Sequence, residues 1–583
     1  MLADEYLAQE LSDGVEIIAW IAAQDWCEGN VGMMGKSWGG FNALQVAALR
    51  PPALKAIITV CSTDDRYCDD VHYIGGCVLN DNLWWGAIML AYQARPPDPE
   101  IAGPAWRARW LERIAAMPFF PALWLKHPRR DAYWRHGSVC EDFAAIQCPV
   151  FAIGGWADAY SNAVPRLLNG LKGPCLGIIG PWAHLYPHDG VPGPAIGFPQ
   201  EAVRWWDHWL KGRDTGIMKE PMLRAFIEDW TPPGDRDPTP GRWVGRALGR
   251  LSSQSILDMR FGAGVIGPGA ETVGDASFHS PAFTGAAAGE WMGTGVGSEA
   301  PIDQRFDDAF SLTFDSAPLD RRFEWLGAPE VEVTLSSDVP IAQLCVRLCD
   351  VAPDGSSRRV SYGLFNLTHR ESHAEPKPLT PGAPVTVRLR LNDCGYAFAP
   401  GHRLRLAFST AYWPLVWPAP TPATLTLHGP GLLRFRAWPE VDGAVAFPPP
   451  LPGKPTPTTV LKAGSFTREF KHDVTTGVAT YTTHGQGGLF GEGVRRFDEI
   501  GVSLSHDLKR ELTIRGDDPL SARYEIDQAY EMGFAERRIR IETKLEMSAD
   551  GEAFRVKGVL KAFEDGALAA QRVWDERIAR DLV

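Results

Sequence analysis

One serine in the sequence stands where an activated nucleophile is typically found. Ser37 is the centre of a Gly-x-Ser-x-Gly motif in VGMMGKSWGGF (31–41), where an apolar run passes into a helical pattern. A serine hydroxyl attacks a carbonyl carbon efficiently only if a base takes its proton and the oxyanion is stabilised. A sharp strand-to-helix turn exposes such a serine at the edge of a sheet. Ser37 is therefore the candidate nucleophile; the alternative is an ordinary serine in a glycine-rich turn.

The residues around Ser37 suit the same chemistry. Gly35 and Gly39 are expected to keep side chains out of the tight crossing of strand and helix. The positive end of the helix dipole favours a developing oxyanion. The amide N–H of Trp38 is the expected oxyanion donor, and its indole is a candidate to line the site.

A candidate acid and a candidate base follow Ser37 in the chain. Asp158 ends the run VFAIGGWAD, and His184 ends the run LGIIGPWAH. The order serine, acid, histidine is that of α/β hydrolases, with each residue just past a strand end. The alternative for Asp158 alone is a helix-capping loop acid, and the alternative for His184 alone is a solvated turn histidine. The weaker rivals are His188 for the base, and Asp189 and Asp207 for the acid.

The elements that must position these residues alternate between strand and helix patterns. Such alternation predicts a parallel, doubly wound sheet, with ligands beyond the carboxyl ends of its strands. This α/β-hydrolase domain is predicted over 1–65 and 147–240. The expected strands are 29–35, 54–62, 148–158, 174–184 and 222–230, and the expected helices are 11–24, 39–49, 162–171 and 201–212.

Residues 66–146 interrupt that alternation with tryptophan-rich amphipathic patterns, such as NDNLWWGAIMLAY and PAWRARWLERIAAM. We interpret this segment as a helical cap over the sheet. Trp156 is a further candidate to line the substrate site. Asp64 and Asp65 are candidates to bind a substrate amine; the alternative for them is a structural pair that caps a helix or lies at the hinge of the cap.

The rest of the chain is predicted to be all-β. Apolar and polar residues alternate with period two across 245–445, which favours an antiparallel β-sandwich or jelly roll. The stretch PPPLPGKPTPTT (448–459) is typical of a stiff connector. Residues 460–583 contain further strand-like runs, which either form a second β layer or extend the first.

Composition excludes several classes of protein. A net charge of −13 over 583 residues argues against a surface for nucleic acid or anionic membrane. The ten cysteines form no CxxC pair or Cys/His cluster, so we expect neither a metal site nor a disulfide framework. No signal peptide and no apolar run long enough to span a membrane is visible. A cytoplasmic location is the expectation.

Three blocks of sequence carry a resemblance to a known family. DWCEGNVGMMGKSWGG, GGWADAY and IGPWAH resemble the signature blocks of the cocaine-esterase-like (CocE/NonD) hydrolases, which are related to Xaa-Pro dipeptidyl-peptidases and α-amino-acid ester hydrolases. The resemblance covers residues 1–440 and implies a hydrolase sheet, a helical cap and a jelly roll. It implies that Ser37 is the nucleophile, His184 the general base and Asp158 its orienting acid, with no cofactor. It does not extend to the segment after 460.

In that family the elbow follows several earlier strands and a tyrosine-containing loop that gives a second oxyanion donor. We therefore expect Met1 to be a misassigned start or a truncation. A site lacking one such donor is expected to lose about a hundred- to a thousand-fold in rate.

These observations favour a serine hydrolase that cleaves ester or amide bonds through an acyl-enzyme. The first alternative is an Xaa-Pro dipeptidyl-peptidase. The second is a catalytically impaired hydrolase or a β-sandwich binding protein. The expected partners are small esters or amides or short peptides, not nucleic acid or membrane, and a homodimer is left open.

Overall fold

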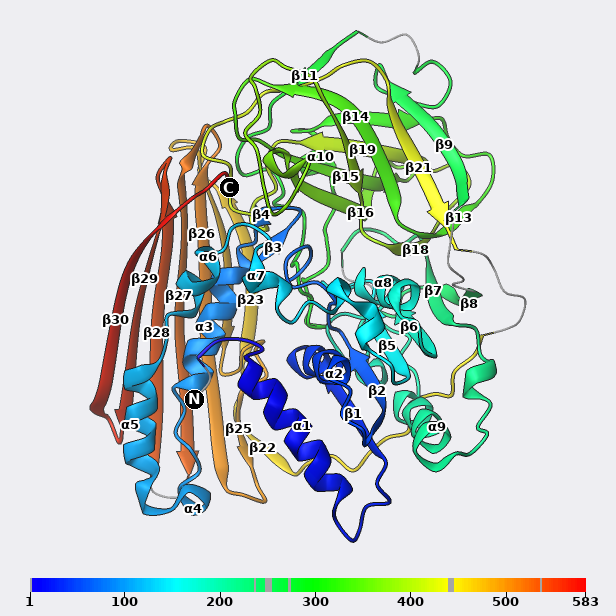
Figure 1. Ribbon diagram of the computed structural model, residues 1–583. Coiled ribbons are helices and arrows are strands. Elements are labelled where there is room, and N and C mark those ends of the chain that lie inside the picture. Colours follow the sequence, from blue (N-terminus) through cyan, green and yellow to red (C-terminus); the bar gives the residue numbers. More distant parts are fainter. Residues whose placement is uncertain (1–2, 235–236, 247–253, 271–273, 439–444, 535–536) are drawn as a thin grey trace.

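Three large β-sheets organise the described part of the molecule, and a small two-stranded sheet lies in the cap (Figure 1). The computed structural model describes residues 3–583 except 235–236, 247–253, 271–273, 439–444 and 535–536. Among the described residues, no helix is both long enough and apolar enough to cross a membrane.

The first sheet is the predicted parallel one. Its strands run in the order β1-β2-β5-β6-β7, each parallel to the next, so their carboxyl ends share one edge. Most of their residues are buried, as expected for a sheet covered on both faces. The strands are β1 (Val31–Lys36), β2 (Leu54–Val60), β5 (Val150–Gly155), β6 (Cys175–Gly180) and β7 (Leu223–Asp229).

Helices cover this sheet on both faces, which confirms the doubly wound arrangement. Three helices pack on one apolar core together with residues such as Ile57 and Ile179. A fourth packs on the other face through Phe198 and Trp205, against Ile58. The first three are α1 (Ala8–Ala22), α2 (Trp38–Ala48) and α8 (Ala163–Gly170), and the fourth is α9 (Phe198–Lys211).

Three later strands also join the first sheet, so the predicted domain boundary near 245 does not separate the two sheets. β18 (Cys394–Phe398) pairs in parallel with β7, β13 (Phe323–Gly327) pairs with β18, and β8 (Gly241–Arg246) pairs antiparallel with β7. The α/β-hydrolase sheet therefore continues into segments that alternate apolar and polar residues.

The second sheet forms the β-rich domain and encloses its own apolar core, centred on residues such as Val346, Leu406 and Phe408. A short helix, α10 (Arg305–Asp308), precedes its strand β12. The strands are β9 (Gln254–Gly262), β10 (Val265–Ile266), β11 (Ala276–Phe278), β12 (Leu312–Ser316), β14 (Pro329–Ser337), β15 (Gln343–Val351), β16 (Ser357–Asn366), β17 (Val385–Arg390), β19 (Arg403–Ser409), β20 (Leu425–Leu427) and β21 (Gly431–Ala437).

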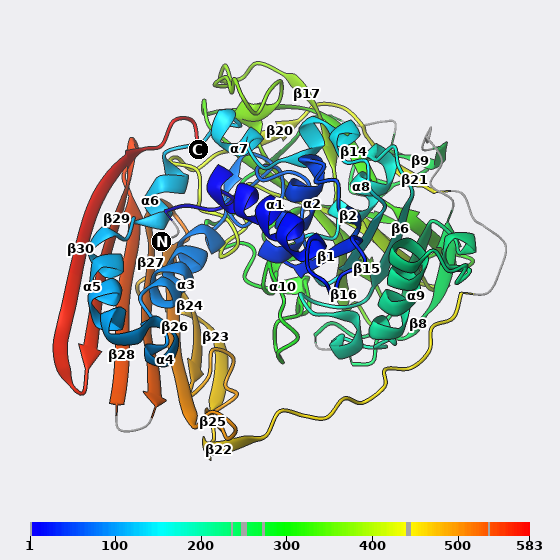
Figure 2. The ribbon, with the colours of Figure 1, turned by 60° about the horizontal axis from the view of Figure 1, so that its bottom comes forward.

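The third sheet is separate from the other two. Residues 448–457 run to it as an extended, largely exposed connector, which Figure 2 shows as a long strand-free trace. The sheet is antiparallel throughout. Its strands are β22 (Thr458–Lys462), β23 (Ser465–His472), β24 (Val478–Gln486), β25 (Val494–Phe497), β26 (Val502–Arg515), β27 (Asp518–Phe534), β28 (Arg537–Ala549), β29 (Ala553–Glu564) and β30 (Ala567–Ala579).

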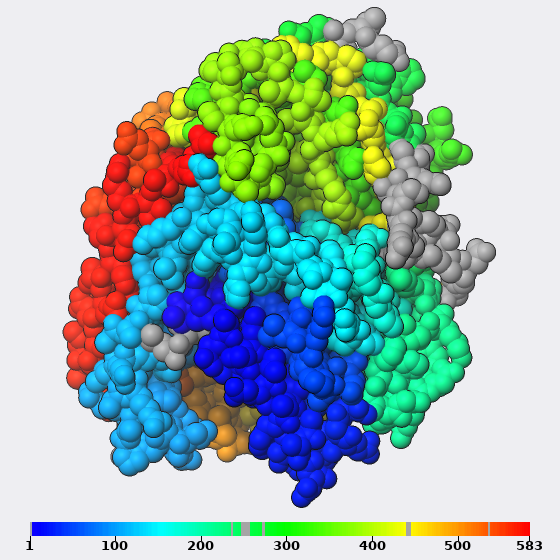
Figure 3. Space-filling model, viewed as in Figure 1, coloured from blue at the N-terminus to red at the C-terminus, as the bar shows by residue number. Residues whose placement is uncertain are grey.

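The helical cap packs against this C-terminal sheet, and the two share one apolar core (Figure 2). The ring of Phe119 stacks on that of Trp574 at 5.2 Å, and the Gln528 side chain donates to the carbonyl of Ala87 at 2.9 Å. On the face in Figure 3 the cyan cap lies between the red strands and the blue N-terminal segment. The cap contains β3 (Tyr73–Ile74), β4 (Cys77–Val78), α3 (Asp81–Gln93), α4 (Pro99–Ala102), α5 (Trp106–Ala116), α6 (Phe120–Leu125) and α7 (Ala132–Arg135).

Candidate active site

Ser37 occupies the sharp turn between β1 and α2. Its backbone has φ 56° and ψ −125°, a region that residues other than glycine rarely adopt. Its N–H donates to the carbonyl of Val60 at 2.9 Å, so the turn is tied to the end of β2. Strained backbone of this kind persists where the surroundings hold it, and functional sites are where it clusters.

Only one of the two glycines singled out near Ser37 has the predicted role. A methyl group at Gly35 would lie 2.1 Å from the carbonyl carbon of Gly39, and one at Gly40 would lie 2.9 Å from the hydroxyl of Ser62. A methyl group at Gly39 would meet nothing within 4 Å. The prediction is therefore right for Gly35 and wrong for Gly39, because the side chain position of Gly39 points into open space; the second tight approach is at Gly40.

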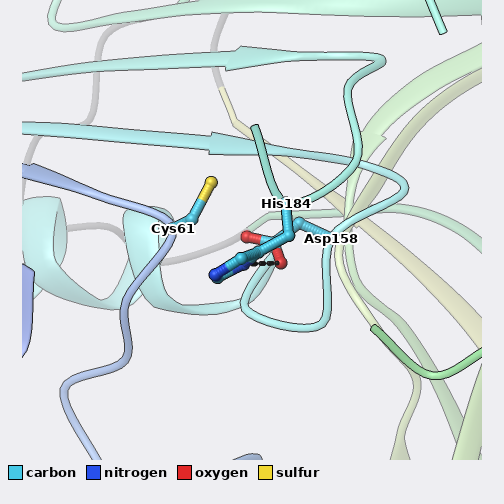
Figure 4. Close-up of side chains that lie close together, drawn as sticks. All are labelled: Cys61, Asp158 and His184. Atoms are coloured by element: carbon cyan, nitrogen blue, oxygen red, sulfur yellow. Dashed lines mark hydrogen bonds and ion pairs between the residues drawn. The ribbon is translucent and has the colours of Figure 1, made fainter. Parts of the chain in front are cut away.

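Asp158 and His184 form a buried hydrogen-bonded pair. Asp158 follows β5 and His184 follows β6, and Nδ1 of the imidazole lies 2.9 Å from Oδ1 of the carboxylate (Figure 4). The Asp158 side chain is fully buried and that of His184 is 9% exposed. A carboxylate at Nδ1 favours the tautomer with the proton on Nδ1, which leaves Nε2 free to accept one.

The loop after β6 brings His184 back towards the elbow. The Nζ of Lys36 donates to the carbonyl of His184 at 3.1 Å, so the backbone of His184 lies beside the residue that precedes Ser37. Within the described residues, the Ser37 hydroxyl has no hydrogen bond to His184. Catalytic hydrogen bonds are often long in the free enzyme and tighten when substrate binds. The absence of a Ser37–His184 hydrogen bond in the free protein is therefore compatible with its formation in the substrate complex.

An aromatic residue that no sequence pattern marks, Tyr160, packs against His184. The ring of Tyr160 packs edge-on at 5.8 Å from the imidazole, and that of Trp291 lies 5.9 Å from Tyr160. The Tyr160 hydroxyl donates to Asp70 at 2.9 Å, and burial raises the pKa of Asp70 to about 6. Tyr160 lies two residues after Asp158, but no spacing rule marks it.

Trp38 lies where an oxyanion donor and a wall of the site are expected. It is the first residue of α2, and the first N–H groups of a helix have no partner within the helix. Its indole N–H donates to Glu10 at 2.6 Å, and its ring lies 5.0 Å from that of Tyr6 and 6.2 Å from that of Trp85. The indole is therefore fixed by the N-terminal segment and the cap.

Trp156 lies on the other side of Asp158. Its indole N–H donates to the carbonyl of Phe226 at 2.7 Å. It borders a cavity of about 370 Å³ between the loops of the first sheet and the β-rich domain, together with Asp158, Trp291 and Tyr362. Trp156 and Asp158 line this cavity, whereas Ser37 and His184 do not.

Asp64 and Asp65 each form an ion pair with an arginine. Arg166 donates two hydrogen bonds to Oδ1 of Asp64, at 2.6 and 2.8 Å, and also binds Asp69 at 2.6 Å. Asp65 accepts from the backbone N–H of Tyr67 at 3.0 Å and lies 3.3 Å from Arg130. These contacts fit the structural alternative, a charged pair at the start of the cap, better than a free amine site.

Cys61 is the third member of a cluster around the acid–base pair. A ligand atom of each of Cys61, Asp158 and His184 lies within 4.8 Å of the others (Figure 4). A zinc ion would need the thiolate, but burial, followed by the nearby Asp158 charge, raises the thiol pKa well above its usual value. Because Nδ1 of His184 is also engaged by Asp158, the cluster suits acid–base chemistry better than a resident metal.

The weaker rivals form ion pairs away from His184. His188 is 3.5 Å from Asp189, whose side chain is 73% exposed. Asp207 pairs with Lys211 at 2.7 Å and with Arg213 at 3.1 Å. Neither acid is placed to orient His184.

Comparison with known proteins gives two family matches. Residues 3–186 match the X-Pro dipeptidyl-peptidase (S15 family) profile, and residues 235–465 match that of the X-Pro dipeptidyl-peptidase C-terminal non-catalytic domain. Together the two matches cover most of the chain and stop close to the start of the C-terminal sheet.

The names of individual relatives agree with these family matches. The chain is 25% identical over 449 residues to the cocaine esterase of Rhodococcus sp. (strain MB1 Bresler), a match that covers 69% of this chain and 76% of the relative. It is 24% identical over 492 residues to a putative Xaa-Pro dipeptidyl-peptidase of Streptomyces avermitilis, covering 73% and 64%.

Solved structures share the fold. A CocE/NonD family hydrolase from Staphylococcus aureus superposes with a TM-score of 0.55 at 15% identity, over 74% of this chain and 77% of that one. An α-amino acid ester hydrolase superposes with a TM-score of 0.56 at 19% identity, over 73% and 79%.

Fold and relatives together define a serine hydrolase of the α/β-hydrolase class. Within that class, residues 3–186 belong to the X-Pro dipeptidyl-peptidase (S15) family and residues 235–465 to the family of its C-terminal non-catalytic domain, and the chain is similar to a cocaine esterase and to a CocE/NonD family hydrolase. The expected family resemblance is thereby confirmed, as is the expected α/β-hydrolase fold followed by a β-rich domain.

Proposed function

We propose that the protein hydrolyses small esters or amides through an acyl-enzyme on Ser37. The observation that carries this proposal is the buried Asp158–His184 hydrogen bond of 2.9 Å at the same sheet edge as the Ser37 elbow. A fixed, oriented imidazole at the same sheet edge as a half-buried serine can activate that serine's hydroxyl once substrate brings the two together.

In this mechanism Nε2 of His184 takes the Ser37 proton as the hydroxyl oxygen attacks the substrate carbonyl. Asp158 stabilises the imidazolium that forms. The amide N–H of Trp38 and the N-terminus of α2 stabilise the oxyanion. The tetrahedral intermediate collapses, the leaving alcohol or amine takes the proton from His184, and an ester on Ser37 remains. Water, deprotonated by His184, then releases the acid.

A second candidate is an Xaa-Pro dipeptidyl-peptidase, favoured by the family of both matched domains. Such an enzyme must also recognise a free peptide amine. Asp64 and Asp65 are paired with Arg166 and Arg130, which lowers the support for amine recognition by those two acids. We therefore place the ester or amide hydrolase first.

Parallel assays test the proposal. p-Nitrophenyl esters and Ala-Pro p-nitroanilide would be compared with wild type, Ser37→Ala, His184→Ala and the matched control His188→Ala. We expect Ser37→Ala and His184→Ala to lose at least ~1000-fold in kcat, with His188→Ala close to wild type. Ester turnover that survives in Ser37→Ala contradicts the mechanism, and faster turnover of the Ala-Pro substrate favours the second candidate.

A further inference from the structure

The loop of residues 290–299, here called the histidine-support loop, contacts the backbone on both sides of the acid–base pair. The carbonyl of Gly293 accepts the His184 backbone N–H at 2.8 Å. A methyl group at Gly293 would lie 3.0 Å from the carbonyl oxygen of Ala157 and 3.5 Å from the side chain of Ala183. The loop therefore touches the residues just before Asp158 and just before His184.

A second contact runs through ring packing. Trp291 meets Tyr160 edge-on at 5.9 Å, with 86° between the planes, and Tyr160 meets the His184 ring at 5.8 Å. Trp291 is 5% exposed. A shift of the loop would thus disturb both the backbone and the ring environment of the histidine.

The loop is closed on itself by Glu299. Its carboxylate accepts backbone N–H groups from Thr294 at 2.6 Å, Gly295 at 2.9 Å and Val296 at 3.1 Å. The carbonyl of Glu299 accepts the Glu290 N–H at 3.0 Å. The two ends of the loop are therefore joined by its own hydrogen bonds, and its position depends on what holds Glu290.

The C-terminal sheet holds Glu290. One carboxylate oxygen accepts from Arg468 on β23 at 3.1 Å and from the Tyr481 hydroxyl on β24 at 2.8 Å. The other accepts from Arg510 on β26 at 2.9 Å. Burial opposes the charge of Glu290, but the two guanidinium groups outweigh it and lower its pKa to about 2. Charge-assisted hydrogen bonds of this kind are strong and directional.

Arg510, on β26 of the same sheet, also contacts the cap. The guanidinium of Arg510 lies 5.1 Å from the ring centre of Trp84, on α3, while its Nε donates to Thr483 at 2.8 Å. One side chain of the C-terminal sheet therefore touches both the cap and the anchor of the histidine-support loop.

We propose that Glu290 is a positioning residue for His184, and that residues 458–579 act in catalysis by holding it. The inference rests on the proposed function, since it concerns the same histidine. It gives a role to a sheet that begins where the matched family domains end. Small displacements of a catalytic group, of about 1 Å, are enough to cost about a hundred-fold in rate.

Glu290→Gln is the primary test, with kcat expressed per active site titrated by a fluorophosphonate. The amide keeps the shape but removes the charge from between two arginines. We expect kcat per active site to fall about 10- to 100-fold while KM changes less than about 3-fold. A merely structural role would instead lower the number of titratable sites and leave kcat per site unchanged. Arg555→Gln is the control, since Arg555 pairs with Asp575 on exposed sites of the same sheet.

Two milder variants keep the test decisive if Glu290→Gln does not fold. Tyr481→Phe removes one hydrogen bond to Glu290, and Arg510→Lys keeps the charge but not the forked geometry. We expect a decrease in kcat per site of at least ~3-fold in each, at unchanged thermal stability for Tyr481→Phe. Wild-type kcat per site in every folded variant overturns the inference. Activity that survives in Ser37→Ala would instead overturn the proposed function, so the two failures are distinguishable.

Discussion

The imidazole of His184 and the carboxylate of Asp158 share a buried hydrogen bond of 2.9 Å, although 26 residues separate them in the chain. The bond exists because β5 and β6 are adjacent parallel strands whose carboxyl ends deliver both residues to one edge. It fixes the ring of the histidine without using Nε2, the nitrogen that a serine proton would need.

The Asp158–His184 bond predicts the effect of Asp158→Asn. The amide fits the same space but no longer stabilises an imidazolium, and it favours the wrong tautomer of the ring. We expect kcat for an activated ester to fall about 10⁴-fold, with thermal stability near that of wild type. Steady-state kinetics checks this, with Asp189→Asn as the exposed control. A decrease below about 3-fold would remove Asp158 from the mechanism.

The elbow predicts that alanine is harmful at one glycine of the motif and tolerated at another. Gly35→Ala places a methyl group 2.1 Å from the backbone of Gly39, so the crossing must open. We expect this variant to lose most activity and several degrees in Tm. Gly39→Ala meets nothing within 4 Å and should fold with a Tm near wild type. Equal Tm values for the two variants would show that the crossing is not tight.

The cluster around Arg166 predicts a stability effect rather than a substrate effect. Arg166→Met leaves the buried carboxylates of Asp64 and Asp69 without their cation. Breaking a buried pair in this way typically costs about 3 kcal/mol or more, so thermal unfolding should show a clearly lower Tm. Asp64→Asn should lower Tm without altering the ratio of Ala-Pro to ester turnover. A selective rise in KM for the Ala-Pro substrate would restore Asp64 as an amine site.

Asp81 predicts a pH-dependent stability. Burial, together with the nearby Glu290, raises the pKa of this carboxyl from 3.8 to about 7. The folded protein therefore holds a proton that the unfolded chain releases above pH 4, and this contribution to stability falls as pH rises from 4 to 7. Asp81→Asn removes the effect, so its stability relative to wild type should rise by about 2 kcal/mol between pH 5 and pH 7.5.

Thermal unfolding at the two pH values measures this difference. Asp320→Asn is the control, because Asp320 is exposed. A Tm difference between Asp81→Asn and wild type that stays constant from pH 5 to pH 7.5 would contradict the assigned burial of the charge.

Local patterns were sufficient to predict where the candidate site residues lie in the fold. Ser37, Asp158 and His184 each follow an apolar run that the structure forms as a strand, so their shared edge could be inferred from strand order alone. The strand-like runs predicted within residues 460–583 are likewise strands in the structure. In these places the information lies within about ten residues of the feature.

Local patterns could not predict contacts between segments that are distant in the sequence. Glu290 is an acid in a loop, and its partners Arg468 and Arg510 lie 178 and 220 residues further on. Period-two alternation shows that a strand has a buried face but not which sheet it joins, so β13 and β18 were assigned to the β-rich domain rather than to the first sheet. For the same reason the cap was expected over the sheet, and its packing on residues 458–579 was not foreseen.

Covalent labelling of the wild-type chain with a fluorophosphonate, followed by mass spectrometry of its peptides, tests the central claim most directly. The account predicts one adduct per chain, on the peptide that contains Ser37, lost in Ser37→Ala and slowed at least ~100-fold in His184→Ala. An adduct on another serine, or labelling of Ser37 that is as fast without His184 as with it, would contradict it.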